Sequence, residues 1–346
     1  MPLVSRPFSL NTYCLSKVWF RTSSVDLRVG DITAITKKIK SYCYQDLYQK
    51  PSEVMLYRPV EKGGLGLHHV ASKAKANLIT TFLQTATGNT FQTSLYHSWL
   101  FRYHVMGEEG LPNPGVPPFY SVNFFDVIRQ VQDNSPLNPV YMSVKQWYQY
   151  LLEKHVIERE LDDEGRSELI PCKVEEREPT APWMESYRLS KLKGISPITK
   201  SFNFKLLHTL LPSNERINHL NPNATALCRL NCGAVETYLH LFYDCHHNQG
   251  AGDALLRCVR SYDIDLTESK SLTMRIKVDG CFEMAVISIL STGLELIWSR
   301  RLVKKNTDLI TMRSELEWAA ILRRKSRNPK IKEAGDIMIN MINNFF

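Results

Sequence analysis

Three cysteines and one histidine fall close together in this chain of 346 residues. They are Cys228, Cys232, His240 and Cys245, spaced C-x3-C-x7-H-x4-C. The other five of the eight cysteines are scattered, at a density too low for a small secreted scaffold held by disulfides, so a reducing compartment is expected. The local density therefore indicates that these four side chains belong to one site.

The four side chains could coordinate one tetrahedral zinc ion, because thiolate sulfur and imidazole nitrogen are ligands that zinc prefers. The short loop from Cys228 to Cys232 can present two thiolates to one metal, and Gly233 relieves crowding where the chain turns back. If residues 237–245 are helical, His240 and Cys245 can both face that loop. Four protein ligands leave no position for water, so the sequence predicts a closed, structural Zn²⁺ site.

Two alternatives stay open at this point. Free cysteine is often buried, so the four residues could be ordinary core side chains. His246 or His247, which stand beside Cys245, could also take the place of His240 as the fourth ligand.

The apolar pattern predicts a mainly α, multidomain fold with a small zinc-stabilised Cys3His module. Apolar residues recur every three to four positions, as on the buried face of a helix. The segments with this pattern are 10–20, 31–44, 70–86, 141–156, 183–220, 251–259 and 281–298. Asp31 could cap the second of them, and Gly63, Gly64 and Gly66 predict a tight structural turn before the third. The run 281–298 contains two glutamates, which favours a buried helix over a membrane span.

The formal charge of +8 favours a polyanionic partner. Residues 300–332 hold 11 Lys and Arg against 3 Asp and Glu. The cations expected to contact nucleic acid are Arg300, Arg301, Lys304, Lys305, Arg323, Arg324, Lys325 and Arg327. The alternative is a solvated helix face. Leu302, Leu309 and Leu316 recur every seven residues, which predicts one helical stripe that packs onto the body of the protein rather than forming a dimer.

Three segments of the chain resemble one protein family. The stretch FKLLHTLLPSNER, residues 204–216, followed by the Cys3His segment, resembles the zinc-binding domain at the C-terminal end of non-LTR (LINE-type) retrotransposon reverse transcriptases. SLNTYCLSKVW, residues 9–19, and RPVEKGGLGL, residues 58–67, resemble the stretch that follows the polymerase core in the same proteins. The segments occur in the family's order, and the resemblance they carry runs along nearly the whole chain.

The resemblance implies a parent protein that is an RNA-directed DNA polymerase, often with an endonuclease. This chain departs from it, because it has neither the aromatic-x-Asp-Asp polymerase turn nor a recognisable endonuclease. Leu161-Asp162-Asp163 lies between glutamates and is interpreted as an acidic loop. His68 and His69 have no Ser or Cys nucleophile motif near them, and the isolated His104, His155 and His208 are expected to be surface or core histidines. We therefore expect a fragment of a longer protein that is not an enzyme.

Composition and resemblance together predict four regions. These are a helical post-polymerase (thumb-like or connection) region at 1–105, a loop-rich and acidic insert or linker at 106–182, a zinc-binding domain at 183–262 and a helical basic region at 263–346. The expected partners are RNA or DNA and the missing polymerase core, with no membrane and no small-molecule substrate. The expected location is intracellular, in the nucleus or cytoplasm. The alternative is a protein-interaction module from a decayed or domesticated retroelement.

Overall fold

The computed structural model describes residues 1–22, 27–45, 47–48, 50–51, 53–87, 141–153, 186–187, 192–274, 276 and 280–346. Helices dominate these residues, which confirms the mainly α prediction, and within them the only strand-like pairing is an isolated antiparallel bridge between Leu227 and Val235. The acidic Asp162-Asp163 pair, His104, His155 and most of the expected insert lie outside the described residues.

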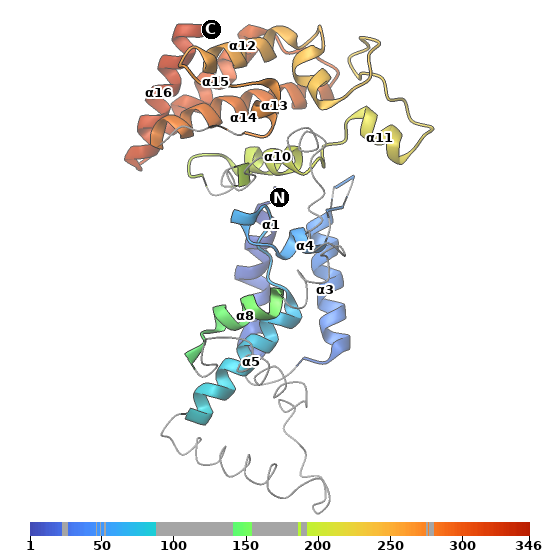
Figure 1. Cartoon of the computed structure of the whole chain (residues 1–346), viewed down its shortest axis with the longest axis vertical. Coiled ribbons are helices and arrows are strands. Elements are labelled where there is room, and N and C mark those ends of the chain that lie inside the picture. The colour runs from blue at the N-terminus through green and yellow to red at the C-terminus, as the bar shows by residue number, and fades with distance from the viewer. Residues whose placement is uncertain are drawn as a thin grey trace, which may run out of the picture. The chain divides into compact units, whose positions relative to one another are not determined.

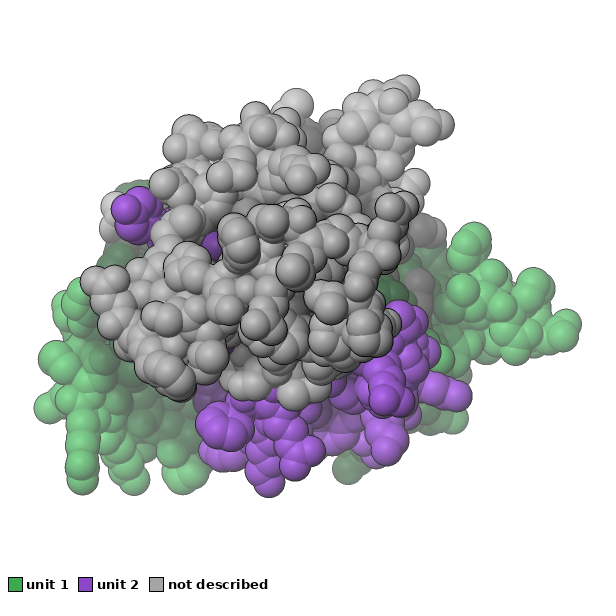
Figure 2. Space-filling model, turned by 90° about the horizontal axis from the view of Figure 1, so that it is seen from below, with its two compact units in different colours: residues 1–5, 46–65, 169–346 green, residues 6–45, 66–168 purple. Residues whose placement is uncertain are grey.

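The chain divides into two compact units, which Figure 2 distinguishes by colour. Unit 1 contains Met1–Ser5, Asp46–Leu65 and Leu169–Phe346, and unit 2 contains Arg6–Gln45 and Gly66–Glu168. Both units are assembled from segments that are distant in sequence. The four regions predicted from the sequence are consecutive segments, unlike these two units, and they stay a prediction.

Unit 2 is built around a long helix that three other helices contact. Its elements are most of α1 (Ser5–Ser9), the π-helix η1 (Leu10–Cys14), α2 (Leu15–Thr22), α3 (Val29–Tyr44), α5 (Val70–Thr87) and α8 (Val144–Leu152). α2, α3 and α8 each pack on α5. Trp147 and Leu151 of α8 and Ile79 of α5 are fully buried in the small core. The buried Arg6 donates hydrogen bonds to the carbonyls of Tyr42, Cys43 and Gln45, where α3 ends.

Unit 1 is a helical assembly, shown in yellow-green to red in Figure 1 apart from its segments before residue 66, which are blue. Its elements are α4 (Glu53–Tyr57), η2 (Val60–Lys62), α10 (Pro197–Leu207), α11 (Asn214–Leu220), η8 (His240–Asp244), α12 (Gln249–Arg260), α13 (Glu268–Leu272), α14 (Gly280–Leu302), α15 (Leu309–Arg324) and α16 (Pro329–Phe345). α10 begins where Ser196 accepts a hydrogen bond from the Thr199 amide at 3.0 Å.

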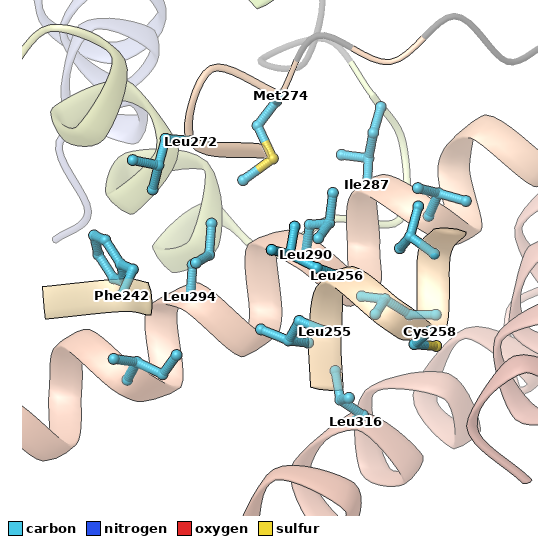
Figure 3. Packing of buried hydrophobic residues seen from close by; sticks show 14 of the residues in the cluster. Phe242, Leu255, Leu256, Cys258, Leu272, Met274, Ile287, Leu290, Leu294 and Leu316 are labelled. Atoms are coloured by element: carbon cyan, nitrogen blue, oxygen red, sulfur yellow. The ribbon is translucent and has the colours of Figure 1, made fainter. Parts of the chain in front are cut away.

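Helix α14 is the centre of unit 1. It contacts α10, α12, α15, α16 and η8, and Figure 3 shows its Leu290 and Leu294 among side chains from these neighbours. Among the described residues it is the one helix long and apolar enough to cross a membrane, but 56% of that window is buried inside the protein. The expectation of a buried helix at 281–298 is therefore confirmed.

Two details of the predicted helices are wrong. The stripe of Leu302, Leu309 and Leu316 crosses a break, because α14 ends at Leu302 and Asp308 caps a new helix by accepting from the Thr311 amide at 2.8 Å. Leu302 and Leu309 are exposed, while Leu316 is fully buried in the core of unit 1. The first of the two seven-residue intervals, from Leu302 to Leu309, thus crosses from one helix to the next. Asp31 does not cap α3, which begins at Val29, and instead lies in its first turn.

The predicted glycine turn is present. Gly63 and Gly66 have φ of 81° and 65°, which is the left-handed region that favours glycine. A Cβ on Gly64 would lie 2.0 Å from the carbonyl oxygen of Arg58, so this position has no room for a side chain. A Cβ on Gly63 would lie 2.7 Å from the ring of Tyr187, another residue of unit 1.

The turn supports a buried histidine. His208, which directly follows α10, forms a hydrogen bond with the backbone of Gly63, and its ring stacks on Tyr187 at 5.7 Å between centroids and contacts Phe204 at 4.3 Å. Its Nε2 is buried without a hydrogen-bond partner. Burial lowers the pKa of His208 to about 4, so the folded protein holds the ring neutral. The expectation of a core or surface histidine is met by a core one.

This burial predicts acid sensitivity. In the unfolded chain His208 is protonated below its ordinary pKa of 6.5. In the folded chain it stays neutral until the pH falls to about 4. The stabilisation is fully present above pH 6.5 and is lost as the pH falls to 4, at a cost of about 3 kcal/mol. In urea unfolding, His208→Phe should lose less stability than the wild type between pH 7 and 4.5. His219→Gln, which changes an exposed histidine, should follow the wild type, and equal pH slopes for all three proteins would refute the expectation.

Candidate metal centre

The first two cysteines lie on a tight hairpin. The Leu227–Val235 bridge closes its base, and the Cys228 amide donates to the Ala234 carbonyl at 2.8 Å. The chain reverses through Asn231 and Gly233, with φ of 61° and 85°. Asparagine and glycine are the residues that most readily adopt this conformation. The sequence Asn-Cys-Gly thus determines the turn that points Cys228 and Cys232 to the same side.

The other two residues lie on a wide helical turn. In an α-helix, residues five apart are rotated by roughly 140° from each other, which would separate His240 from Cys245. Here residues 240–244 form the π-helix η8, and the Cys245 amide donates to the His240 carbonyl at 2.7 Å. This wider turn aligns the two residues. The sequence required this segment to be helical if His240 and Cys245 were to face the hairpin. The segment is helical, with a π rather than an α turn.

A glycine allows η8 to sit close to α12. A Cβ on Gly252 would lie 2.2 Å from the carbonyl oxygen of Phe242. Leu241, Phe242 and Tyr243 are buried in the core of unit 1. The turn that carries His240 is therefore fixed to the helical core on one side and faces the cysteine hairpin on the other.

The four side chains converge as predicted. Sγ of Cys228, Cys232 and Cys245 and a ring nitrogen of His240 all lie within 4.8 Å of one another, close enough to bind one metal ion. Cys228 and Cys245 are 3.8 Å apart at Sγ, and Cys232 Sγ lies 3.0 Å from His240 Nε2. The distance between the two sulfurs far exceeds a disulfide bond of about 2.05 Å. All four residues are buried except Cys232, which is partly accessible.

His246 and His247 do not join the cluster. Their rings pack against each other at 3.8 Å between centroids, and the group of potential ligands contains His240 alone of the three histidines. The alternative ligand left open by the sequence is thus not the arrangement observed.

Burial sets the protonation of the free cluster. It raises the pKa of Cys228 to about 12, to which hydrogen bonds from Cys232 and the charge of Cys245 add. Burial likewise raises the pKa of Cys245 and lowers the pKa of His240. Without a cation the thiols of Cys228 and Cys245 are therefore neutral at pH 7, and so is the imidazole of His240. A divalent cation that binds here must displace the thiol protons, which couples metal affinity to pH.

A buried ion pair ties the hairpin to α14. Glu236 and Arg301 are both fully buried and hydrogen-bonded to each other. The Glu236 carboxylate also accepts from the backbone amides of Asn214 and Arg229, both at 2.8 Å. Arg229 lies within the Cys228–Cys232 loop, so one carboxylate connects this loop, the start of α11 and the end of α14.

The structure corrects part of the predicted cationic surface. Arg301 is buried in the pair with Glu236, and Arg323 is 7% exposed, so neither guanidinium belongs to the exposed cationic surface that the sequence predicted. Arg300 is paired with Asp308 at 3.7 Å, and Arg324 with Asp336 at 2.7 Å. The four remaining cations of the predicted set are exposed and have no carboxylate within 4.0 Å among the described residues: Lys304, Lys305, Lys325 and Arg327.

One histidine contact was missed in the sequence. Nδ1 of His69 lies 2.8 Å from Oγ of Ser72 in unit 2. Ser72 is 1% exposed, and its hydroxyl also lies 3.4 Å from the Leu151 carbonyl. The pair begins helix α5 and offers a substrate no access to the hydroxyl. The i, i+3 spacing at a helix start is the signal that could have indicated this capping role.

The cluster has to be interpreted from its own geometry. A comparison with models of known protein families and with curated proteins finds no match to this chain.

Proposed function

We propose that the Cys3His cluster binds a structural zinc ion. At ligand distances of about 2.3 Å for sulfur and about 2.0 Å for nitrogen, a tetrahedral site separates two sulfurs by about 3.8 Å and sulfur from nitrogen by about 3.5 Å. The corresponding distances here are 3.8 Å and 3.0 Å. A tetrahedral set of soft sulfur donors with one imidazole favours zinc over harder cations. With four protein ligands the ion would hold the hairpin on η8 and carry no reaction.

The chain is, in this proposal, the zinc-binding, nucleic-acid-binding C-terminal portion of a non-LTR retrotransposon reverse transcriptase. It lacks the catalytic core and assists binding of RNA or target DNA. The observation that carries the proposal is the convergence of the four ligands, in the segment where the sequence resembles that family's zinc-binding domain. The net charge of +8 and the four exposed cations near the C-terminus, which have no carboxylate partner among the described residues, support a polyanionic partner.

Salt dependence tests the nucleic-acid role. The zinc-loaded chain should bind a 30-nucleotide single strand or duplex with an affinity that falls steeply as the salt concentration rises. In a plot of log affinity against log salt concentration, each phosphate contact contributes about 0.7 to 0.9 to the negative slope. Replacing Lys304, Lys305, Lys325 and Arg327 by glutamine should weaken binding and reduce the slope by up to about 3. Fluorescence anisotropy from 50 to 300 mM salt measures both quantities.

The matched control changes cations elsewhere. Lys37→Gln with Lys38→Gln alters two exposed lysines of α3 in unit 2 and should leave the slope close to that of the wild type. Binding that is absent at every salt concentration, from protein that carries its metal, would contradict the nucleic-acid role. That result would favour the protein-interaction module instead.

A further inference from the structure

A groove on unit 1 has features that the function proposed above does not use. It has a volume of about 880 Å³ and lies between α10, α14, α15 and the start of α16. Its apolar lining includes Ile198, Trp318 and Leu322, which are 63%, 57% and 52% exposed. Exposed large apolar side chains gathered around a groove mark a binding surface.

An incompletely partnered guanidinium lines the same groove. Arg323 is 7% exposed, its Nη1 donates to the Ala319 carbonyl at 2.8 Å, and its Nε is buried without any hydrogen-bond partner. In the part of the chain that the structure describes, no carboxylate lies within 4.0 Å of it. A buried cation without a counter-charge is costly, so an anionic ligand would relieve an unfavourable arrangement that already exists.

The charges along the groove favour an anion at one end. Lys325 lines that end beside Arg323, and the following turn and first residues of α16 add Arg327, Lys330 and Lys332, all exposed. The groove also contains two carboxylates. Glu315 lies two to three turns away along α15, about 12 to 15 Å from the cations. Glu295 is hydrogen-bonded to Thr199, and burial raises its pKa, which favours its neutral form.

We infer that this groove binds a single-stranded nucleic-acid segment, with an unpaired base stacked on Trp318 and its phosphates at Arg323 and Lys325. An exposed indole next to cations is the combination that single strands need, because every base has a face to stack and every nucleotide a phosphate. A duplex hides its base faces and cannot use the indole in this way. This inference rests on the proposed nucleic-acid function and gives it a location and a preference for single strands.

The test compares variants of Trp318 on matched ligands. Trp318→Ala should weaken binding of a 20-nucleotide single-stranded RNA by roughly 5- to 150-fold, the equivalent of one stacked base. Trp318→Phe should retain most of the affinity, and binding of a duplex of the same length should change less than 2-fold. Ile310→Ala removes an 83% exposed apolar side chain of the same helix that does not line the groove, and should behave as the wild type.

A second readout does not depend on affinity. The RNA carrying 5-bromouridine should crosslink under ultraviolet light to the peptide that contains Trp318, and Arg323→Gln or Lys325→Gln should reduce the yield. If the wild type binds RNA but Trp318→Ala binds equally well, or the crosslinks map elsewhere, the groove is not the site and a peptide is its better occupant. If the wild type binds no nucleic acid at any salt concentration, the proposed function fails as well.

Discussion

Replacing Cys245 by serine is expected to reduce bound zinc from about one ion per chain to nearly none. Cys245 is fully buried, its Sγ lies 3.8 Å from that of Cys228, and no other His, Cys, Asp or Glu among the described residues joins the cluster to substitute for it. Binding free energies of about 10 to 16 kcal/mol for structural zinc in small domains become folding free energy when the site forms only in the folded state. The hairpin should therefore lose its protection against proteolysis together with the metal.

The measurement is metal content by mass spectrometry of the purified chain, with limited proteolysis alongside. Cys228→Ser should give the same result as Cys245→Ser. Cys14→Ser, which changes an exposed cysteine of unit 2, and His246→Ala, which changes an exposed neighbour outside the cluster, should keep about one ion per chain. Zinc near zero in the wild type, or unchanged in both ligand variants, would refute the site.

Breaking the buried pair of Glu236 and Arg301 should be the most damaging change outside the ligands. Arg301→Met leaves a carboxylate buried without its counter-charge, which typically costs 3 to 5 kcal/mol. Arg301 also lies over the Trp298 ring at 4.6 Å, so part of the loss reflects this contact. Glu236→Ala should cost a comparable amount, because it also removes the acceptor for the amides of Asn214 and Arg229.

Urea unfolding of both single variants and the double variant measures the pair. The double variant should lose less stability than the sum of the two single losses. Each single variant leaves one buried charge without its partner, whereas the double variant leaves none. Arg313→Met is the control, because it breaks a partly exposed ion pair with Glu317, which is worth about 1 kcal/mol or less. Equal losses for the exposed and the buried pair would contradict this account.

A merely structural role would affect stability alone, whereas Arg301 should also influence the metal. Glu236 accepts from the Arg229 amide inside the hairpin, and such supporting contacts typically change metal affinity by 10- to 100-fold. Arg301→Met should therefore lose zinc to a chelator at lower concentration than the wild type under conditions where both are folded. Unchanged chelator resistance would limit the pair to a role in stability.

The sequence predicts local features of this protein better than distant ones. Ligand spacing predicted the convergence of the four Cys and His side chains, because Cys-x3-Cys with a glycine and a nearby helical turn is a local pattern. The apolar periods at 70–86 and 281–298 predicted α5 and α14 to within a few residues. The Glu236–Arg301 pair spans 65 residues and has no local pattern, so Arg301 was assigned to the surface. The seven-residue leucine period was local but misleading, because it does not register the break after Leu302.

The contact between Arg301 and Glu236, which are 65 residues apart in the sequence, also limits how short a fragment with an intact cluster can be. A fragment ending at residue 262, where the sequence alone would place the end of a zinc-binding domain, contains all four ligands but ends before α14. Its Glu236 would face solvent with no guanidinium beside it, and η8 would keep α12 but lose α14, one of the two helices on which it packs. The shortest segment that encloses the cluster in its native surroundings therefore extends to the last turn of α14. Deletions or insertions between residues 262 and 301 should thus disturb a metal site from which they are remote in sequence.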